Sequence, residues 1–316
     1  MVVTLFIISI ITFIVIQLPP GDYLTLLAIR YEKSGWPTDQ ALFDALRVRY
    51  GLDKSIVEQY AVWITNYLKG DMGYSFEWKL EVSLLIWERL FLTLAFSITS
   101  LIITLLISLP IGTYSALKQH SAGDYIFTFI GFIGVSIPEF MLALFLMFMA
   151  FDKLGMDVGG LFSPQYADAA WSFGKFIDLL KHLWLPAVIL AMAQTAAYIR
   201  TFRANLLDEL KKPYVTTARA KGIPHRKLLM KYPIRIAMNP FISSIAYILP
   251  RLISGATIIS VVLNLPTTGP LLLGALQAQD MFLAGSFLML FSILTVIATF
   301  FSDLLLAAVD PRIRYF

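Results

Sequence analysis

The sequence predicts an all-α integral membrane protein with six membrane-spanning helices. Hydrophobic residues make up 58% of the chain and charged residues only 15%, and the mean hydropathy is +0.74. A soluble domain carries about 25% charged residues. The apolar residues also form stretches of about 20, the length that a helix needs to cross about 30 Å of hydrocarbon. The chain therefore belongs in a bilayer, in contact with membrane lipid.

The same composition excludes several kinds of site. The absence of cysteine rules out disulfides, thiolate metal sites and cysteine nucleophiles. The three histidines are scattered along the chain, which leaves too few ligands for a catalytic metal centre. The net charge of +4 is small and its basic residues gather in one loop, so nucleic acid is not an expected partner.

Six apolar stretches fit spanning helices. The first, residues 1–18, has no basic leader and no small-residue cleavage site before Pro19, so we interpret it as a retained anchor and not as a signal peptide. The others are residues 90–117, 125–151, 183–201, 240–263 and 281–309. Spans two to five carry Pro110, Pro138, Pro186 and Pro250, respectively. Such breaks are tolerated where neighbouring helices satisfy the freed carbonyl groups, so a packed bundle is expected.

Basic residues set the predicted orientation, because short loops rich in lysine and arginine stay on the cytoplasmic side. Between spans four and five, Asp208 and Glu209 are outnumbered by Arg200, Arg203, Lys211, Lys212, Arg219, Lys221, Arg226, Lys227, Lys231 and Arg235. The loop between spans five and six, residues 264–280, has no lysine or arginine. We therefore expect residues 202–239 and both termini to lie on the cytoplasmic side.

Residues 19–89 form a long extracytoplasmic loop that we expect to be helical. Thr38 can cap an amphipathic helix that stops at Gly51, and Ser55 to Glu58 has capping-box spacing before a second helix that ends near Gly70. Two interpretations stay open. The loop is either a small folded cap or a set of helices on the outer membrane surface, held there by Tyr60, Trp63, Ile64 and Tyr67. The core, residues 90–316, then contains the other five spans.

The cytoplasmic loop contains the signals of short helices. Pro213 disfavours helix in the residue before it and suits the first turn of the next helix, so the helix that leaves the membrane ends near Lys212. A short helix is then expected over residues 213–221. Its small and polar side chains allow another surface to approach closely: Thr216, Thr217, Ala218 and Ala220.

Two signals follow this short helix. Gly222 can adopt the left-handed conformation that ends it, and Pro224 then begins a basic helix over residues 226–235. A helix, a glycine and a helix across the inner face of a membrane domain are suited to transmit a push from a partner. The alternative is a basic hairpin that rests on anionic lipid, where each surface lysine or arginine contributes about 1 kcal/mol.

Residues 214–222, Tyr-Val-Thr-Thr-Ala-Arg-Ala-Lys-Gly, resemble the EAA signature of ABC importer permeases, in the form found in the dipeptide/oligopeptide permease family. The resemblance covers nearly the whole chain and implies the type I ABC importer permease fold. Other segments match in order and spacing: Gly70-Asp71-Met72-Gly73, Ser136-Ile137-Pro138, Leu265 to Gly269 with Gln279-Asp280, and Asp310 to Arg314. Two departures stand out. Thr216 and Thr217 replace the glutamate and first alanine of the signature, and residues 266–269 replace the PGxG of the last outer loop.

The resemblance implies a coupling helix that sits in a groove of an ATPase subunit. Its residues here are Pro213, Tyr214, Thr216, Thr217, Ala218, Arg219, Ala220, Lys221 and Gly222. The implied partners are a second homologous permease subunit, two ATPase subunits and an extracytoplasmic solute-binding protein. The chain has no Gly-x-x-x-x-Gly-Lys-Ser/Thr loop, so ATP and Mg²⁺ are expected on the partners and no cofactor on this chain. Members of this family branch carry short peptides or oligosaccharides, so both cargo classes stay open.

Polar groups within the membrane are costly and suggest function by default. Gln194 in span four, Glu139 after Pro138 and Arg251 after Pro250 are candidates for a translocation path. The simpler interpretation is that Glu139 and Arg251 snorkel to the surface or pair with each other.

Other classes of function fit the sequence less well. A membrane zinc protease needs His-Glu-x-x-His on a helix, and none of His120, His182 and His225 has a partner at that spacing. The main alternative is an ion-coupled secondary transporter or a channel, but the sequence shows no convincing internal repeat and no membrane carboxylate pair. We therefore predict a permease subunit of an ATP-driven importer of the cytoplasmic membrane, which is not itself an enzyme.

Overall fold

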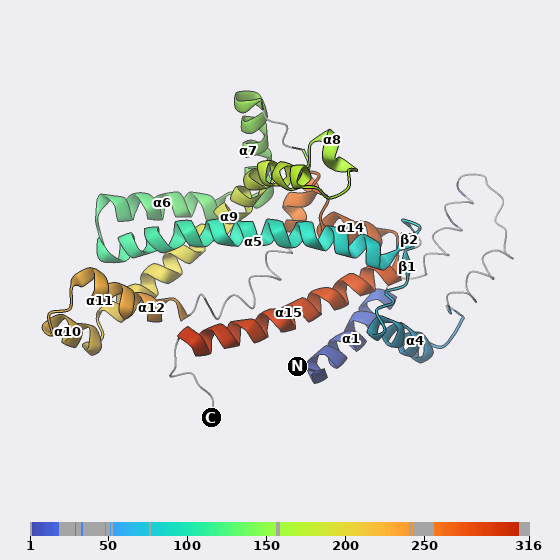
Figure 1. Cartoon of the computed structure of the whole chain (residues 1–316), viewed down its shortest axis with the longest axis horizontal. Helices are drawn as coiled ribbons and strands as arrows, with labels where there is room; N and C mark the ends of the chain where they lie inside the picture. Colours follow the sequence, from blue (N-terminus) through green and yellow to red (C-terminus); the bar gives the residue numbers. More distant parts are fainter. Residues whose placement is uncertain are drawn as a thin grey trace. The chain divides into compact units, whose positions relative to one another are not determined.

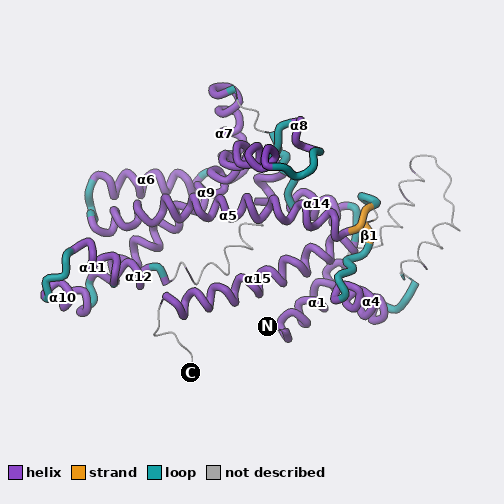
Figure 2. Tube along the Cα trace, viewed as in Figure 1, coloured by secondary structure: helices purple, strands orange, loops and turns teal. Residues whose placement is uncertain are grey.

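The computed structural model describes residues 2–18, 29, 33, 48, 51, 53–75, 77–155, 159–239, 242 and 256–309. These residues are nearly all helical, with one short β-hairpin (Figures 1 and 2). The chain forms two compact units, Met1–Phe91 with Thr267–Val296, and Leu92–Pro266 with Ile297–Phe316. The predicted all-α class is therefore confirmed for the described part of the chain.

The first unit has an aromatic core. The unit contains α1 (Val2–Gln17), α4 (Ile56–Leu68), the antiparallel strands β1 (Tyr74–Ser75) and β2 (Leu80–Glu81), α14 (Thr268–Gln277) and the first part of α15 (Met281–Val309). Phe13 of α1, Trp63 and Tyr67 of α4, and Met289 of α15 are buried together, with Tyr60 and Ile64 packed beside them. The aromatic face of α4 thus packs against α1 and α15, and the choice between a folded cap and a surface helix stays a prediction.

The predicted capping box begins α4. Ser55 Oγ accepts a hydrogen bond from Glu58 N, and Ser55 N donates to Glu58 Oε2 at 3.0 Å. The Ser55 hydroxyl also donates to Glu58 Oε2 at 2.8 Å, and this bond, followed by the one from Ser55 N, holds the pKa of Glu58 below its usual value. The helix predicted after Thr38 lies outside the described residues.

A buried carboxylate joins two segments of the first unit that are 205 residues apart in sequence. Asp280 Oδ2 accepts hydrogen bonds from Ser75 Oγ at 2.6 Å and Glu77 N at 3.3 Å, and its Oδ1 accepts from Leu283 N at 3.2 Å. Gly73 has a φ of +85°, and a Cβ there would lie 2.8 Å from the Phe282 ring, so only glycine fits. We call this contact of the β1–β2 hairpin with the start of α15 the clasp.

The second unit is arranged around one long helix, α9 (Phe173–Leu210). It also contains most of α5 (Val82–Leu117), α6 (Ala122–Ser136), α7 (Glu139–Leu154) and the short α8 (Pro164–Ala167). The short helices α10 (Pro213–Ala220), α11 (His225–Lys231) and α12 (Pro233–Ala237) follow α9 in the chain. Helix α9 packs against α6, α7 and α12. Its buried residues Leu183, Ile189 and Leu190 share a core with Ala143 and Ile259. A displacement of α9 would therefore move the several helices that pack against it.

The predicted spans agree with the structure to different degrees. Helix α5 and Met281–Ala308 are each long and apolar enough to cross a membrane, and two further spans are possible if two bent pairs each count as one. Span three is not one continuous helix, because α6 and α7 meet at 101°. Pro138 lacks the amide hydrogen that would continue the helix, and Ile137 is extended. Span four lies within α9, whose two parts meet at 51°, while Pro186 is accommodated inside the helix. Most of span five lies outside the described residues, so the number six stays a prediction.

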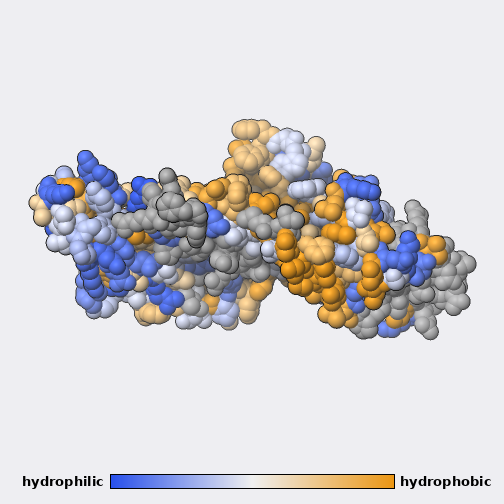
Figure 3. Space-filling view, turned by 90° about the horizontal axis from the view of Figure 1, so that it is seen from below, coloured by the Kyte–Doolittle hydropathy of each residue, from blue (hydrophilic) through white to orange (hydrophobic). Residues whose placement is uncertain are grey.

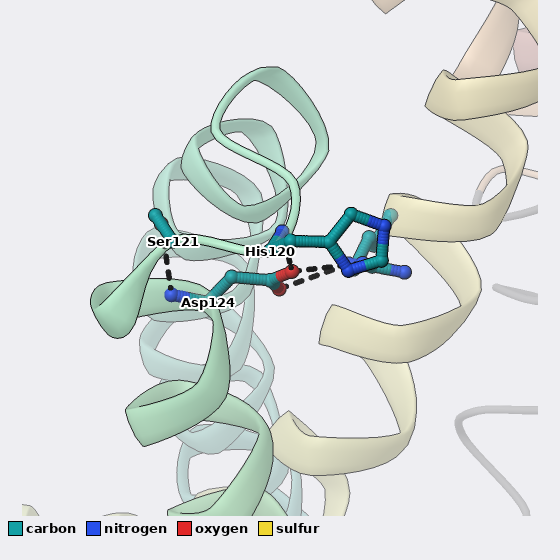
Figure 4. A network of polar contacts seen from close by, with 4 residues as sticks. His120, Ser121 and Asp124 are labelled. Atoms are coloured by element: carbon teal, nitrogen blue, oxygen red, sulfur yellow. Dashed lines mark hydrogen bonds and ion pairs between the residues drawn. The ribbon is translucent and has the colours of Figure 1, made fainter.

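An ion pair fixes the turn between α5 and α6 to α9. Arg203 of α9 donates to both carboxylate oxygens of Asp124, from Nε at 3.0 Å and from a terminal nitrogen at 2.8 Å. Figure 4 shows the Asp124 carboxylate at the turn formed by His120 and Ser121, where His120 N also donates to it at 3.0 Å. Asp124 is buried at 3% exposure, and the Arg203 side chain is 26% exposed. Bidentate, largely buried pairs of this kind are geometrically specific.

The substitution Asp124→Asn tests the importance of this pair for stability. It removes the charge that Arg203 faces and leaves a largely desolvated guanidinium with a neutral partner. Because Arg203 keeps some exposure to solvent, we expect a loss of about 2 kcal/mol, somewhat below the cost of breaking a fully buried pair. The readout is the apparent Tm of the purified chain in detergent.

Asp152→Asn is the matched control, because Asp152 pairs with Lys153 at 2.8 Å through exposed side chains. Exposed pairs contribute at most about 1 kcal/mol, so its Tm is expected to stay close to that of the native chain. Equal Tm values for the two variants would show that the Asp124 pair has no special structural role.

Candidate coupling interface

Helix α10 (Pro213–Ala220) stands apart from α9 by a two-residue turn. Helix α9 ends at Leu210, and Lys212 is extended with ψ 145°, so that Pro213 occupies the first position of α10. Proline suits this position because the first amides of a helix have no partner within the helix. The predicted short helix is confirmed and ends one residue earlier than expected.

Gly222 ends the turn after α10 in the left-handed conformation, as predicted, with a φ of +74°. Its amide donates to Arg219 O at 3.0 Å. No atom lies within 4 Å of the place where a Cβ would be. The backbone conformation, and not a lack of space, therefore makes glycine the preferred residue here.

The predicted basic helix over residues 226–235 is divided in two. Helix α11 (His225–Lys231) ends at Lys231, and α12 (Pro233–Ala237) begins after the single residue Tyr232. Pro233 cannot donate the amide hydrogen that would continue α11, and Tyr232 takes a non-helical conformation with φ −119° and ψ −82°. A proline inside the predicted segment was therefore the signal for this break.

Helices α10 and α11 form a hairpin with a small core of its own. Val215 and Ala218 of α10 are buried with Leu228 of α11. At its base, Tyr214 Oη donates to Glu209 Oε2 of α9 at 2.5 Å, and the Tyr214 ring lies 6.4 Å from that of Tyr232. The hairpin is thus tied to the last turn of α9 on one side and to α12 on the other.

Helix α12 anchors the hairpin to the rest of the second unit. Ala237 is buried with Phe202 and Leu206 of α9, and Ile234 packs beside them. Arg235 donates to Ala308 O, near the end of α15, at 3.3 Å. The α10–α11 hairpin is consequently an appendage with a packed base and not a free loop.

The exposed side of α10 carries short or charged side chains. The exposed residues of the predicted coupling set are Pro213, Thr216, Thr217, Arg219, Ala220, Lys221 and Gly222. Tyr214 is half-buried. Ala218 is buried in the hairpin core and therefore does not belong to the exposed face, although the sequence places it in the coupling set. Figure 3 shows hydrophilic surface where α10 and α11 lie in Figure 1. This face can receive another protein surface at close range.

Two of the three candidate path residues, Gln194 and Glu139, lie in the described part of the chain. Gln194 is half-buried where the two parts of α9 meet, and Glu139 is half-buried in the first turn of α7. The side chain of neither residue makes a hydrogen bond or ion pair within the described part of the chain. Arg251 lies outside the described residues, so its pairing with Glu139 stays a prediction.

Sequence reasoning missed two side-chain contacts of α9. The sequence identifies Arg203 and Glu209 only as loop charges, whereas in the structure Arg203 pairs with Asp124 at the α5–α6 turn and Glu209 binds Tyr214 at the base of the hairpin. A charge at the start of one apolar stretch and an opposite charge at the end of another are a weak signal for such a pair. Among the described residues, no group of three or more His, Asp or Glu could hold a metal ion.

Known proteins resemble this chain over almost its full length. It is 34% identical over 310 residues to the oligopeptide transport system permease protein AppB of Bacillus subtilis. This match covers 98% of this chain and 94% of the relative. It is 32% identical to a putative peptide permease protein of Brucella ovis (97% and 93% covered). It is 28% identical to the glutathione transport system permease protein GsiC of Escherichia coli K12 (99% and 95% covered).

The family described as binding-protein-dependent transport system inner membrane component matches residues 108–315, which include the α10–α11 hairpin. Proteins of this kind are permease subunits of ABC importers, and ATP hydrolysis resides in partner ATPases. This finding excludes the ion-coupled transporter considered above. The chain therefore belongs to the family of binding-protein-dependent transport system inner membrane components.

Proposed function

We propose that this chain is one of two homologous membrane subunits of an ATP-driven importer of short peptides. The observation that carries the proposal is the exposed face of α10, held on a packed hairpin within the segment that resembles the EAA signature. The partners are a second permease subunit, two ATPase subunits and an extracytoplasmic solute-binding protein. ATP and Mg²⁺ are bound by the ATPases, and this chain holds no cofactor.

The anchored hairpin gives α10 a mechanical role. Its base is joined to α9 through Tyr214 and Glu209 and through α12, so a push on α10 displaces α9 with it. Helix α9 packs against α6 and α7, which then move as well. Approach of the two ATPases would draw the two coupling helices together and open the cavity outward, and hydrolysis would let it reopen inward. Each step requires a ligand that binds one state more tightly than the other.

The orientation follows from the distribution of basic residues. Residues 202–239 and both termini lie on the cytoplasmic side, where the ATPases are, and residues 19–89 lie on the side of the solute-binding protein. Cargo crosses between the permease subunits, with Gln194, Glu139 and Arg251 as candidate contacts. The names of the relatives, which refer to oligopeptides and glutathione, support peptides over oligosaccharides.

A large side chain on the exposed face of α10 is expected to prevent the ATPase from docking there. Thr216 and Ala220 are one helical turn apart on this face. Replacing either with tryptophan should prevent the cognate ATPase from co-eluting with the purified chain, because the large ring keeps the two surfaces apart. Thr201→Trp places the same bulk on an exposed position of α9 outside the hairpin and should leave co-elution intact. Undiminished co-elution of both α10 variants would refute docking at this face.

The turn at Gly222 is expected to be needed for coupling. Gly222→Val forces a β-branched residue into a left-handed conformation that costs about 1–2 kcal/mol, so the turn between α10 and α11 should change shape. In proteoliposomes with ATPases and solute-binding protein, we expect ATP hydrolysis to continue while uptake per ATP falls several-fold.

Two variants serve as controls for this result. Gly222→Asn should retain most uptake, because asparagine tolerates this conformation. Gly155→Val introduces the same strain at φ +61°, also in open space, at the end of α7. It should leave coupling unchanged. Full uptake by Gly222→Val, or equal losses in the Gly222 and Gly155 valine variants, would count against the role of this turn.

The cargo class is tested with the assembled importer. Proteoliposomes that contain all subunits and the cognate solute-binding protein are offered a labelled mixture of di- to pentapeptides or of oligosaccharides of similar size. We expect ATP-dependent accumulation of peptides alone. Accumulation of oligosaccharides without peptides would overturn the peptide assignment and leave the importer assignment standing.

A further inference from the structure

The segment that begins with α10 contains basic residues but no acidic ones. From Pro213 to Asn239 the chain carries Arg219, Lys221, Arg226, Lys227, Lys231 and Arg235, and no aspartate or glutamate. An ATPase that docks as proposed above contacts α10, because that helix carries the small side chains. Half of these cations lie instead on α11.

Helix α11 has one buried and one exposed face of distinct chemistry. Leu228 and Leu229 are buried. On the exposed side a shallow depression of about 600 Å³ is lined by Pro224, Arg226, Lys227, Met230 and Lys231. Met230 is 63% exposed, so an apolar side chain projects among three cations. In the described part of the chain no carboxylate pairs with these cations, although Lys231 Nζ lies 5.4 Å from the centroid of the Tyr232 ring.

The two helices of the hairpin present different surfaces. Val215 and Ala218 of α10 face Leu228 of α11 across their shared core, so the exposed faces of the two helices point away from that core. The α10 face offers threonines and an alanine beside the single cation Arg219, and the α11 face offers three cations around a methionine. Two surfaces of such different chemistry suit two different partners.

The helix that follows α11 contacts the end of α15. Arg235 of α12 donates to the carbonyl of Ala308, which ends the segment Met281–Ala308 that is long and apolar enough to cross a bilayer. Lys231 precedes Arg235 by four residues, so their backbones lie at most about 14 Å apart. The cations of α11 are therefore within reach of lipid headgroups, and a partner that binds there must fit beside the bilayer.

We propose that the exposed face of α11 binds anionic phospholipid headgroups. Arg226, Lys227 and Lys231 pair with lipid phosphates, and the Met230 side chain enters the boundary of the acyl chains. This contact fixes the hairpin against the bilayer before any ATPase docks on α10. The proposal goes beyond the proposed function and takes from it only the position of the hairpin at a membrane surface.

A single label can test this contact, because the native chain has no cysteine. The full chain with Met230→Cys is labelled with bimane and placed in nanodiscs that contain headgroup-nitroxide lipid. The discs are made of phosphatidylcholine alone or of phosphatidylcholine with phosphatidylglycerol. We expect quenching to be at least about twofold stronger in the anionic discs and to decline as salt is raised.

Matched variants identify the cations responsible. Arg226→Gln with Lys227→Gln and Lys231→Gln should abolish the difference between the two discs. Arg219→Gln with Lys221→Gln removes an exposed cation of α10 and the exposed cation that follows it, and should preserve the difference. A bimane at Thr216→Cys on α10 should show no dependence on lipid charge. Because all these positions are exposed, an unchanged elution profile in detergent is expected for each variant and is checked first.

Three results would overturn the proposal. These are equal quenching of the Met230 label in both discs, quenching that survives the α11 substitutions, and loss of quenching when the cognate ATPase is added. The last result would show that a protein, and not lipid, covers α11 in the transporter. Since the first measurements contain no ATPase, a failure of α10 to dock would leave them unaffected and would be recognised separately by co-elution.

Discussion

The structure of the second unit depends on the packing of α12 and of the hairpin base against the last turns of α9. Ala237, Phe202 and Leu206 exclude water there, and the bond between Tyr214 and Glu209 closes the other side. A short helix such as α10 is marginal in isolation, because the first turn costs more order than its hydrogen bonds return. The packed base therefore both stabilises α10 and makes it able to transmit force.

The two interpretations that the sequence left open for this loop need not compete. Docking and lipid binding are assigned to opposite faces of one hairpin, because α10 and α11 share their buried sides and expose different chemistry. Family membership decides the general function, and the contacts decide how the loop is built. In this arrangement the lipid contact would set where the hairpin rests, and the ATPase contact would set when it moves.

Local features were predictable because their cause lies within a few residues. Proline at position 213, glycine at 222 and the capping box at Ser55 each restrict the backbone directly, and all three are confirmed. The 101° angle after Ser136 was not predictable, since Pro138 signals a break but not its size. Contacts between Asp124 and Arg203 or between Ser75 and Asp280 join residues 79 and 205 positions apart, and no local pattern reports such pairs.

The clasp has a consequence for the order in which the chain folds during synthesis. Asp280 completes the surroundings of Ser75 and Gly73, and Met289 completes the aromatic core begun by Phe13 and Trp63. The first unit must therefore wait for the last helix, while most of the second unit is made in between. Contacts this distant in sequence close late. A ribosome that stalls before α15 would thus release a chain with an unsheltered aromatic surface, which quality-control proteases could distinguish from the finished subunit.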